Sequence, residues 1–350
     1  MSRNVSEQDI FSALGRIHYP GYRTDIVSLG IVEDVTLAAG GGFVITLRHP
    51  GEKDRTLREI GTQIHQLLAH ELGVPKVELK VRKVEAELGE KTGRARIEGT
   101  RWVIAVASGK GGVGKSTVAV NLAAALSQNG YKVGLLDADI YGPSIPMMMG
   151  TGDERPRSAG GQNFYPLERY GIKLISIGFF LQENAPVIWR GPMVMSAVRQ
   201  FLKDTLWGRQ DFLVVDLPPG TGDAQLTLAQ QVALDGVVIV TTPQEVALAD
   251  AVRAVQMFRQ VHCPLLGIVE NMSYFECPDC GERDEPFGHG GGDKMSREES
   301  IPLLGCLPIY AEIRATGDHG MPLVLAHPHH PAATAFKELA RRVASAMPQS

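Results

Sequence analysis

The chain is poor in cysteine, has no excess of basic residues and contains no long apolar run. Only 4 of its 350 residues are cysteine, which is too few for a disulfide scaffold in a chain of this length. Its 35 Lys and Arg are balanced by 39 Asp and Glu, so no global positive field favours nucleic acid or an anionic membrane. No segment approaches the roughly 20 apolar residues that span a bilayer. We therefore expect a cytoplasmic protein with reduced thiols, without nucleic-acid or membrane partners.

The composition is otherwise that of an ordinary globular protein. Hydrophobic residues make up 44% and charged residues 21%, and the length suffices for two domains that each bury a core. The polar N-terminus lacks the apolar centre of a secretion signal. We expect a small α+β domain over residues 1–84, a charged and glycine-containing linker over 85–101, and a larger α/β domain over 102–350.

Hydrophobic periodicity predicts the elements of the small domain. Helical spacing covers residues 5–17 and 55–72, and strand-like patterns cover 31–37, 43–47 and 77–84. Three consecutive glycines between the first two strands indicate a hairpin.

From residue 103 onward, apolar strand candidates alternate with helical stretches. The strand candidates are residues 103–107, 133–137, 174–177, 212–216, 236–241 and 265–270. Near-continuous apolar runs indicate strands buried on both faces, hence a mostly parallel sheet flanked by helices. Such sheets bind ligands beyond the carboxyl ends of their strands.

A glycine-rich loop follows the first of these strands, and the rest of the larger domain is organised around it. Gly109 to Ser116 matches G-x-x-x-x-G-K-[ST], the phosphate-binding loop of nucleoside triphosphatases. Glycines let backbone N–H groups converge on phosphate oxygens, and the next helix points its positive end there. Lys115 is expected to reach the β- and γ-phosphates, Ser116 to ligate Mg²⁺, and Thr117 to lie near the α-phosphate. The loop predicted to bind ATP comprises Gly109, Lys110, Gly111, Gly112, Val113, Gly114, Lys115, Ser116 and Thr117.

Carboxylates end two further strands. Asp137 and Asp139 lie two residues apart on an extended segment, so they point the same way. We assign Asp139 to orienting the attacking water or the Mg²⁺ shell, and Asp137 to support. Asp216 follows four apolar residues, a Walker B pattern that holds Mg²⁺ through water. The next residues, Pro218-Pro219-Gly220, are suited to sense the γ-phosphate as a switch II loop.

Cys277 and Cys280 form a C-x-x-C motif near the end of the last predicted strand. Alone, this motif has several meanings: half of a zinc site, a redox dithiol, or chance. The two remaining cysteines, Cys263 and Cys306, stand singly in apolar contexts. Two thiolates per chain fill half of a four-ligand site, and a symmetric dimer completes it.

These motifs together carry a family resemblance. The loop with its early lysine, Lys110, resembles the deviant Walker A group, in which that lysine reaches the phosphates bound by a partner chain. With the cysteine pair and the stretches at residues 140–144 and 287–292, nearly the whole chain resembles the Mrp/ApbC iron–sulfur cluster carrier ATPases.

The resemblance implies an ATPase that binds a [4Fe–4S] cluster at a homodimer interface and transfers it. Its partners would be apo iron–sulfur proteins and cluster-assembly factors. The residues implied to act in hydrolysis are Lys110, Lys115, Asp139 and Asp216. Asn271 is implied to read adenine, because an Asn amide both donates and accepts hydrogen bonds; a local turn cap is its other interpretation.

The small domain departs from the family pattern at two places. His18-Tyr19-Pro20-Gly21 stands where an acidic-proline turn is common, and Arg48-His49-Pro50-Gly51 stands where a cysteine is common. A domain without cysteine does not hold a cluster through thiolates, so we expect it to dock or position partners.

A different class of function competes with this one: a Min/Par-type positioning ATPase acting on membrane or DNA. It requires a basic amphipathic tail or a basic face. Residues 332–347 place Phe336, Leu339, Val343 and Met347 on one side but carry only three basic residues. We expect this helix to pack against the sheet.

Overall fold

The computed structural model describes residues 5–18, 25–27, 31–38, 42–49, 55–74, 76–83, 94, 96–160, 163–180, 198, 200–277 and 279–348. The chain divides into two compact units. The first comprises residues 1–92, 157–164 and 180–197, and the second comprises 93–156, 165–179 and 198–350. Most of the expected linker lies outside the described residues.

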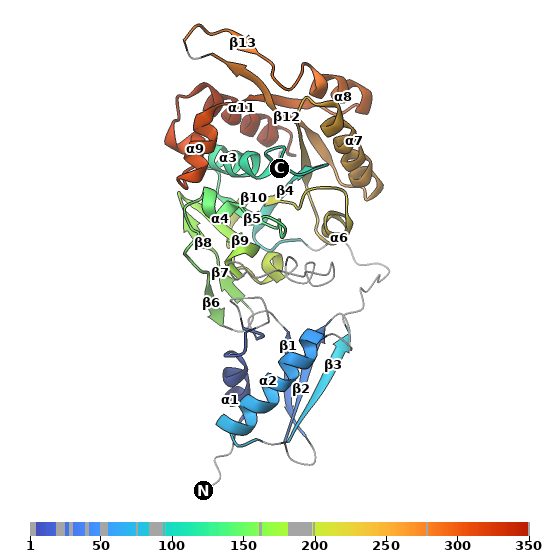
Figure 1. Cartoon of the computed structure of the whole chain (residues 1–350), viewed down its shortest axis with the longest axis vertical. Coiled ribbons are helices and arrows are strands. Elements are labelled where there is room, and N and C mark those ends of the chain that lie inside the picture. The colour runs from blue at the N-terminus through green and yellow to red at the C-terminus, as the bar shows by residue number, and fades with distance from the viewer. Residues whose placement is uncertain are drawn as a thin grey trace. The chain divides into compact units, whose positions relative to one another are not determined.

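Most of the helices are labelled in Figure 1. They are α1 (Glu7–Leu14), α2 (Arg55–Glu71), α3 (Lys115–Gln128), α4 (Ile145–Met148), the short 3₁₀ helix η1 (Ile177–Phe180), α6 (Asp223–Gln231), α7 (Glu245–Gln260), α8 (Gly291–Glu299), α9 (Ala311–Asp318), α10 (Leu323–Ala326) and α11 (Pro331–Ser345). The strands are β1 (Val32–Leu37), β2 (Phe43–His49), β3 (Val77–Lys83), β4 (Thr100–Ser108), β5 (Val133–Asp137), β6 (Arg157–Gly160), β7 (Asn163–Tyr165), β8 (Leu167–Arg169), β9 (Ile172–Ser176), β10 (Gln210–Asp216), β11 (Gly236–Thr241), β12 (Leu265–Glu276), β13 (Arg283–Asp284) and β14 (Leu303–Pro308).

The N-terminal unit contains a three-stranded sheet with two helices. β1 pairs antiparallel with β2, as the glycine turn predicts, and β2 pairs parallel with β3. A capping box starts α1: the Ser6 hydroxyl accepts from the Asp9 N–H, and the Asp9 carboxylate accepts from the Ser6 N–H. Fully buried side chains form the core, including Ile10, Leu14, Ile26, Ile45, Leu47, Ile60, Ile64 and Leu68. The predicted α+β character of this unit is confirmed.

The second unit contains a nine-stranded, mostly parallel sheet in the order β13-β12-β11-β4-β10-β5-β9-β8, with β14 beside β12. Only β13 and β8 pair antiparallel with their neighbours. All five residues of β5 and all six of β11 are buried, as their apolar runs predict. The α/β class with a mostly parallel sheet is confirmed.

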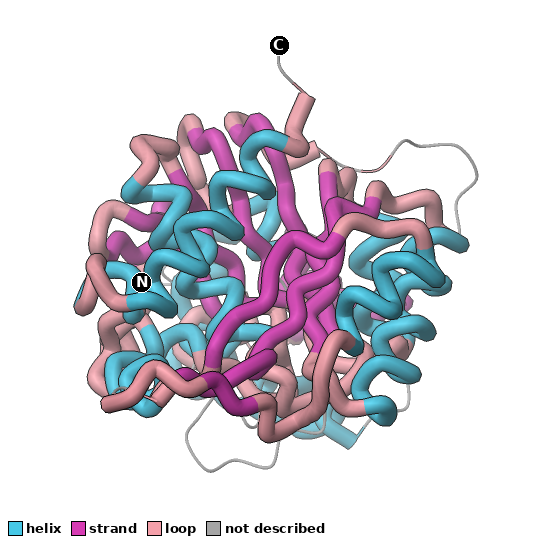
Figure 2. Tube along the Cα trace, turned by 90° about the horizontal axis from the view of Figure 1, so that it is seen from above, coloured by secondary structure: helices cyan, strands magenta, loops and turns pink. Residues whose placement is uncertain are grey.

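Helices cover both faces of this sheet, as the view in Figure 2 shows. The chain moves from β4 to β5 in one direction across the sheet and from β11 to β12 in the other. Right-handed crossovers therefore place α3 and α7 on opposite faces. α11 packs on α3 and β14, burying Phe336, Leu339 and Val343, so the expected packing of this helix is confirmed.

Two of the strand boundaries that differ from expectation affect the linker and the site. β4 begins at Thr100, inside the stretch assigned to the linker, and β12 continues to Glu276 because it pairs with β13 and β14. Asn271 consequently lies within a strand rather than after one. Among the described residues, no helix has the length and apolar character required to cross a membrane.

Candidate functional site

The glycine-rich loop joins the carboxyl end of β4 to the first turn of α3. Gly114 precedes α3 with φ +81°, a left-handed conformation that favours glycine. A side chain there would also collide with the Asn271 amide, 2.2 Å from the position of a Cβ. A Cβ on Gly109 would lie 2.1 Å from the backbone of Asp250 in α7. Packing and backbone geometry thus require glycine at both ends of the loop.

A buried ion-pair cluster lies directly after this loop. The Lys115 ammonium lies 2.7 Å from Asp216 Oδ1 and 3.3 Å from Asp139 Oδ2. Burial alone lowers the pKa of Lys115, but the nearby negative charges outweigh burial and raise it. Burial raises the pKa of Asp216, against the opposing effect of the Lys115 charge. The structure therefore brings together three of the four residues expected to act in hydrolysis.

The same cluster contains oxygen donors suited to Mg²⁺. The Ser116 hydroxyl donates a hydrogen bond to Asp216 Oδ2 at 2.6 Å. A serine hydroxyl and a carboxylate are hard oxygen ligands of the kind that Mg²⁺ prefers. Their convergence beside Lys115 fits a cation that accompanies a bound nucleotide.

Asp137 has a different environment from Asp139. Asp137 is fully buried and accepts hydrogen bonds from the Asp139 N–H at 3.1 Å, the Ile145 N–H at 3.3 Å and the Ser176 hydroxyl at 2.8 Å. Burial, with the Asp216 charge adding to it, raises the pKa of Asp137 to about 8. Its carboxylate therefore fixes the backbone that presents Asp139.

The loop after Asp216 is tied to β4. Leu217 N–H donates to the Val106 carbonyl and Gly220 N–H donates to the Ser108 carbonyl, both at 3.0 Å. The Ser108 hydroxyl donates to the Lys110 carbonyl at 2.9 Å. Ser108 thus contacts both the glycine-rich loop and the switch II loop, which we define as residues 217–222.

The two lysines of the glycine-rich loop differ in their surroundings. Lys115 is 6% exposed and paired with carboxylates. Lys110 is half-buried and forms no ion pair within the part of the chain that the structure describes.

Asn271 contacts the glycine-rich loop from β12. It is 5% exposed, and its side-chain N–H donates to the Val113 carbonyl at 2.8 Å. The next residue, Met272, has φ +54°, where a side chain is strained. The predicted loop residues and Asn271 therefore meet in one place.

The two motif cysteines follow β12 directly, in the turn between β12 and β13. Cys277 N–H donates to the Glu282 carbonyl, and Gly281 N–H donates to the Cys277 carbonyl, both at 2.9 Å. Backbone N–H groups of Cys280 and Asp279 lower the pKa of the Cys277 thiol, which favours the metal-binding thiolate. In contrast, burial raises the pKa of Cys263 and Cys306. No group of three or more His, Cys, Asp or Glu suited to a metal occurs within the described ranges.

Sequence reasoning missed two side chains that brace this site. Ser176 ends β9 and donates to Asp137, and Gln225 on α6 donates to the Pro218 carbonyl. Neither belongs to a motif, and each meets its partner only through the tertiary fold. A polar residue at the carboxyl end of a parallel strand is the one signal that points to Ser176.

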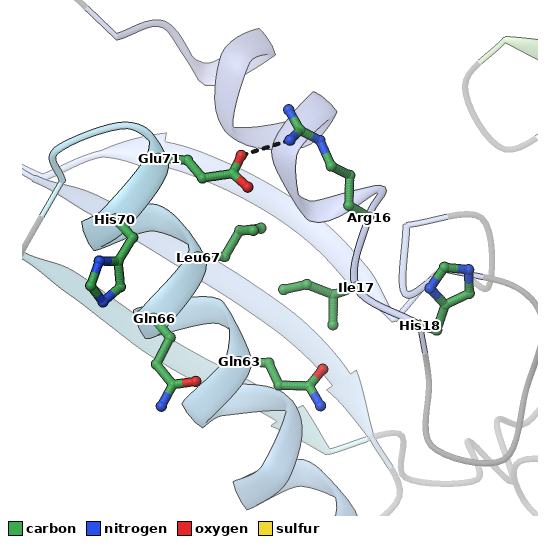
Figure 3. Close-up of a pocket in the computed structure, with 8 residues that line it drawn as sticks. All are labelled: Arg16, Ile17, His18, Gln63, Gln66, Leu67, His70 and Glu71. Carbon is green, nitrogen blue, oxygen red and sulfur yellow. Dashed lines mark hydrogen bonds and ion pairs between the residues drawn. The ribbon is translucent and has the colours of Figure 1, made fainter.

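A separate surface cavity of about 530 Å³ lies in the N-terminal unit, between α2 and the segment after α1 (Figure 3). Arg16 and Glu71 at this cavity form an ion pair at 2.7 Å. Polar side chains dominate the remaining lining: His18, Gln63, Gln66 and His70. Cysteine does not contribute to it.

Comparisons with known proteins agree with this geometry. A model of the ParA family, described as NUBPL iron-transfer P-loop NTPase, matches residues 99–344. The iron–sulfur cluster carrier protein of Synechocystis is 45% identical over 341 residues, 96% of each chain. The iron–sulfur cluster transfer protein NUBPL of Dictyostelium discoideum is 51% identical over 251 residues, 71% of this chain and 78% of the relative.

Solved structures show the same fold. A nucleotide-binding protein from Archaeoglobus fulgidus in complex with ADP superposes with a TM-score of 0.57 at 42% identity, covering 64% of this chain and 88% of its own. The cell division ATPase MinD of Pyrococcus furiosus reaches 0.52 at 24% identity, over 70% of this chain and 98% of its own, and supports the fold alone. The matched family model, the relatives that align over nearly the full chain and the phosphate-binding loop agree. The chain belongs to the iron-transfer P-loop NTPases of the ParA family.

Proposed function

We propose that this protein is an ATP-hydrolysing carrier that holds a [4Fe–4S] cluster between two copies of the chain and passes it to apo-proteins. The observation that carries the proposal is that strand β12 contacts the glycine-rich loop and leads directly into the turn with the cysteine pair. Asn271 on this strand contacts the loop, and Cys277 directly follows its last residue, Glu276. The names of the Synechocystis and Dictyostelium relatives support the same assignment.

The cluster is cargo, and its ligands come from two chains. Cys277 and Cys280 provide two thiolates, whereas a [4Fe–4S] cluster takes four. The backbone N–H groups that lower the pKa of Cys277 stabilise its thiolate before a cluster arrives. A two-fold axis through the hairpins of two protomers would complete the ligand set.

ATP would bind over the glycine-rich loop. Lys115 would leave its pairing with Asp216 and Asp139 to contact the phosphates, Asp139 would orient the attacking water, and Asn271 would contact adenine. Mg²⁺, held by Ser116 and Asp216, would neutralise phosphate charge. Lys110 would reach the nucleotide of the partner chain, so that ATP binding clamps the dimer and hydrolysis loosens the cysteine hairpins.

The remaining parts have supporting roles in this proposal. Residues 1–84 would dock or position cluster-assembly factors or recipients, and 85–101 would be a linker to the ATPase domain, 102–350. The carrier would act in the cytoplasm, without a nucleic-acid or membrane partner.

Anaerobic reconstitution tests the cluster proposal. Wild-type protein incubated with iron, sulfide and thiol should develop a visible absorption band and hold four irons per dimer, as counted chemically. Cys277→Ala should lose both. Cys306→Ala removes a thiol outside the motif and is the matched control, which should keep them.

Three results would overturn the proposal. They are no cluster in the wild type, full retention in Cys277→Ala, or zinc in place of iron after anaerobic purification. Binding to vesicles or DNA in co-sedimentation, without any cluster, would instead favour a Min/Par-type positioning ATPase.

A further inference from the structure

A buried glutamine links the switch II loop to the strand that carries the glycine-rich loop. Gln225 lies in the first turn of α6, directly after switch II, and is 1% exposed. Its side-chain NH₂ donates to the Pro218 carbonyl at 2.5 Å and to the Ser108 carbonyl at 3.4 Å. One side chain therefore bridges the switch II loop and the end of β4.

The neighbours of Gln225 fix the orientation of its amide. Both partners are carbonyl oxygens, which only accept hydrogen bonds, so the NH₂ group must face them. Oε1 then faces away, and within the described chain this buried acceptor has no donor. An unsatisfied buried acceptor costs free energy and calls for an explanation.

The sequence of switch II leaves this loop with few backbone hydrogen-bond donors. Pro218 and Pro219 have no backbone N–H. The first N–H after Leu217 belongs to Gly220, and it already donates to the Ser108 carbonyl at 3.0 Å. Gly220 has φ +94°, a conformation open to glycine, and a Cβ there would meet nothing within 4 Å. Glycine at this position adds no side chain that would hinder a change of backbone conformation.

We propose that Gln225 is a positioning residue that frees the Gly220 N–H for the γ-phosphate of ATP. When Gly220 turns toward the nucleotide, the Ser108 carbonyl loses its shorter hydrogen bond. The Gln225 NH₂, already 3.4 Å away, replaces it, and the end of β4 stays satisfied.

The exchange also bears on the loop that carries Lys110. The Ser108 hydroxyl donates a hydrogen bond to the Lys110 carbonyl at 2.9 Å. If the Ser108 carbonyl keeps a hydrogen bond from Gln225, Ser108 stays in position and holds this loop in place while switch II moves. This inference rests on the proposed ATPase function, in which switch II senses the γ-phosphate.

The test replaces Gln225 by a residue of similar length without a hydrogen-bond donor. Gln225→Met should lower kcat for ATP hydrolysis about tenfold, the value of one hydrogen bond lost on the way to the transition state. The affinity for ADP, which lacks the γ-phosphate, should stay within about twofold, because its contacts do not include the Gly220 N–H. Gln230→Met, at an exposed position of the same helix, is the matched control and should leave kcat unchanged.

A second variant and a second readout separate positioning from folding. Gln225→Leu also removes the donor with an apolar side chain of similar volume, and should show the same loss of kcat if Gln225→Met does not fold. Hydrogen exchange at Gly220 should change when a non-hydrolysable ATP analogue binds the wild type, and this change should be smaller in either variant.

Each outcome bears on one of the two proposals or on both. If the wild type hydrolyses ATP and both variants keep kcat within twofold, the role of Gln225 is overturned and the ATPase function stands. A parallel loss of kcat, nucleotide affinity and melting temperature also overturns it, because that pattern is purely structural. A wild type without ATPase activity overturns both.

Discussion

Individual carboxylates of the nucleotide site have distinct environments despite their similar motifs. Asp139 lies 3.3 Å from the Lys115 ammonium, whereas Asp137 accepts hydrogen bonds from two backbone N–H groups and from Ser176. The sequence places both at the end of one strand, and their spacing predicts a shared direction. The tertiary contacts then separate a residue that faces the cation from one that holds the loop.

The raised pKa of Asp137 makes stability depend on pH. Its pKa is about 8 in the folded chain against 3.8 as the ordinary value, so the folded state binds this proton more tightly. The resulting stabilisation is complete below about pH 4 and is lost as the pH rises through about 8. We expect the free energy of unfolding of the nucleotide-free wild type, relative to Asp137→Asn, to decrease from pH 4 to pH 8.

Urea unfolding at a series of pH values measures this difference. A difference that stays flat or increases with pH would show that Asp137 is charged throughout this range.

At the scale of elements, the glycine-rich loop is held by its packing against α7. A Cβ on Gly109 would lie 2.1 Å from the Asp250 backbone, which cannot move aside as a flexible side chain would. Gly109→Ala should lower the free energy of unfolding by about 1–3 kcal/mol. A Cβ on Gly111 would meet nothing within 4 Å, so Gly111→Ala should stay within about 0.5 kcal/mol of the wild type.

Denaturant unfolding without nucleotide compares the two substitutions directly. If the two substitutions lower the free energy of unfolding equally, the conformation of the loop, rather than contact with α7, accounts for the need for glycine at position 109.

The elements themselves differ in how far the sequence predicts them. Periodicity locates α2 and the buried strands closely, because each has one repeating apolar pattern. β14 was missed, since Leu303–Pro308 is short and contains a glycine and a proline. The length of β12 also escaped prediction because its final residues are strand only through pairing with β13 and β14.

The whole molecule is expected to change its association state with nucleotide. Family resemblance assigns Lys110 to the partner's phosphates, while Lys115 serves its own site. With a non-hydrolysable ATP analogue, light scattering should report a dimer for the wild type and a monomer for Lys110→Ala. Lys110→Ala should still bind nucleotide, because the buried cluster around Lys115 is intact.

Lys115→Ala is the companion variant and should lose nucleotide binding itself. A dimer of Lys110→Ala with the mass and nucleotide dependence of the wild type would exclude a role across the interface.

How well the sequence predicts a site residue depends on whether that residue belongs to a local motif or meets its partner only through the fold. The glycine-rich loop, Asp216 and the cysteine pair were visible in sequence because their chemistry requires fixed local spacing. Ser176 and Gln225 were not, because they reach Asp137 and Pro218 from distant positions in the chain. Local motifs therefore identify the chemistry, and the fold identifies the residues that orient it.

Strand β12 carries the amide that contacts the glycine-rich loop and leads directly into the turn that holds the two thiols. Side chains alternate across a strand, and Phe275 and Glu276 are registered against Asp284 and Arg283. Met272, with φ +54°, interrupts the alternation, but after it one residue inserted or deleted between Tyr274 and Cys277 would shift this pairing and turn the start of the hairpin toward the opposite face of the ribbon. The segment between these two residues therefore tolerates substitution more readily than the insertion or deletion of a single residue.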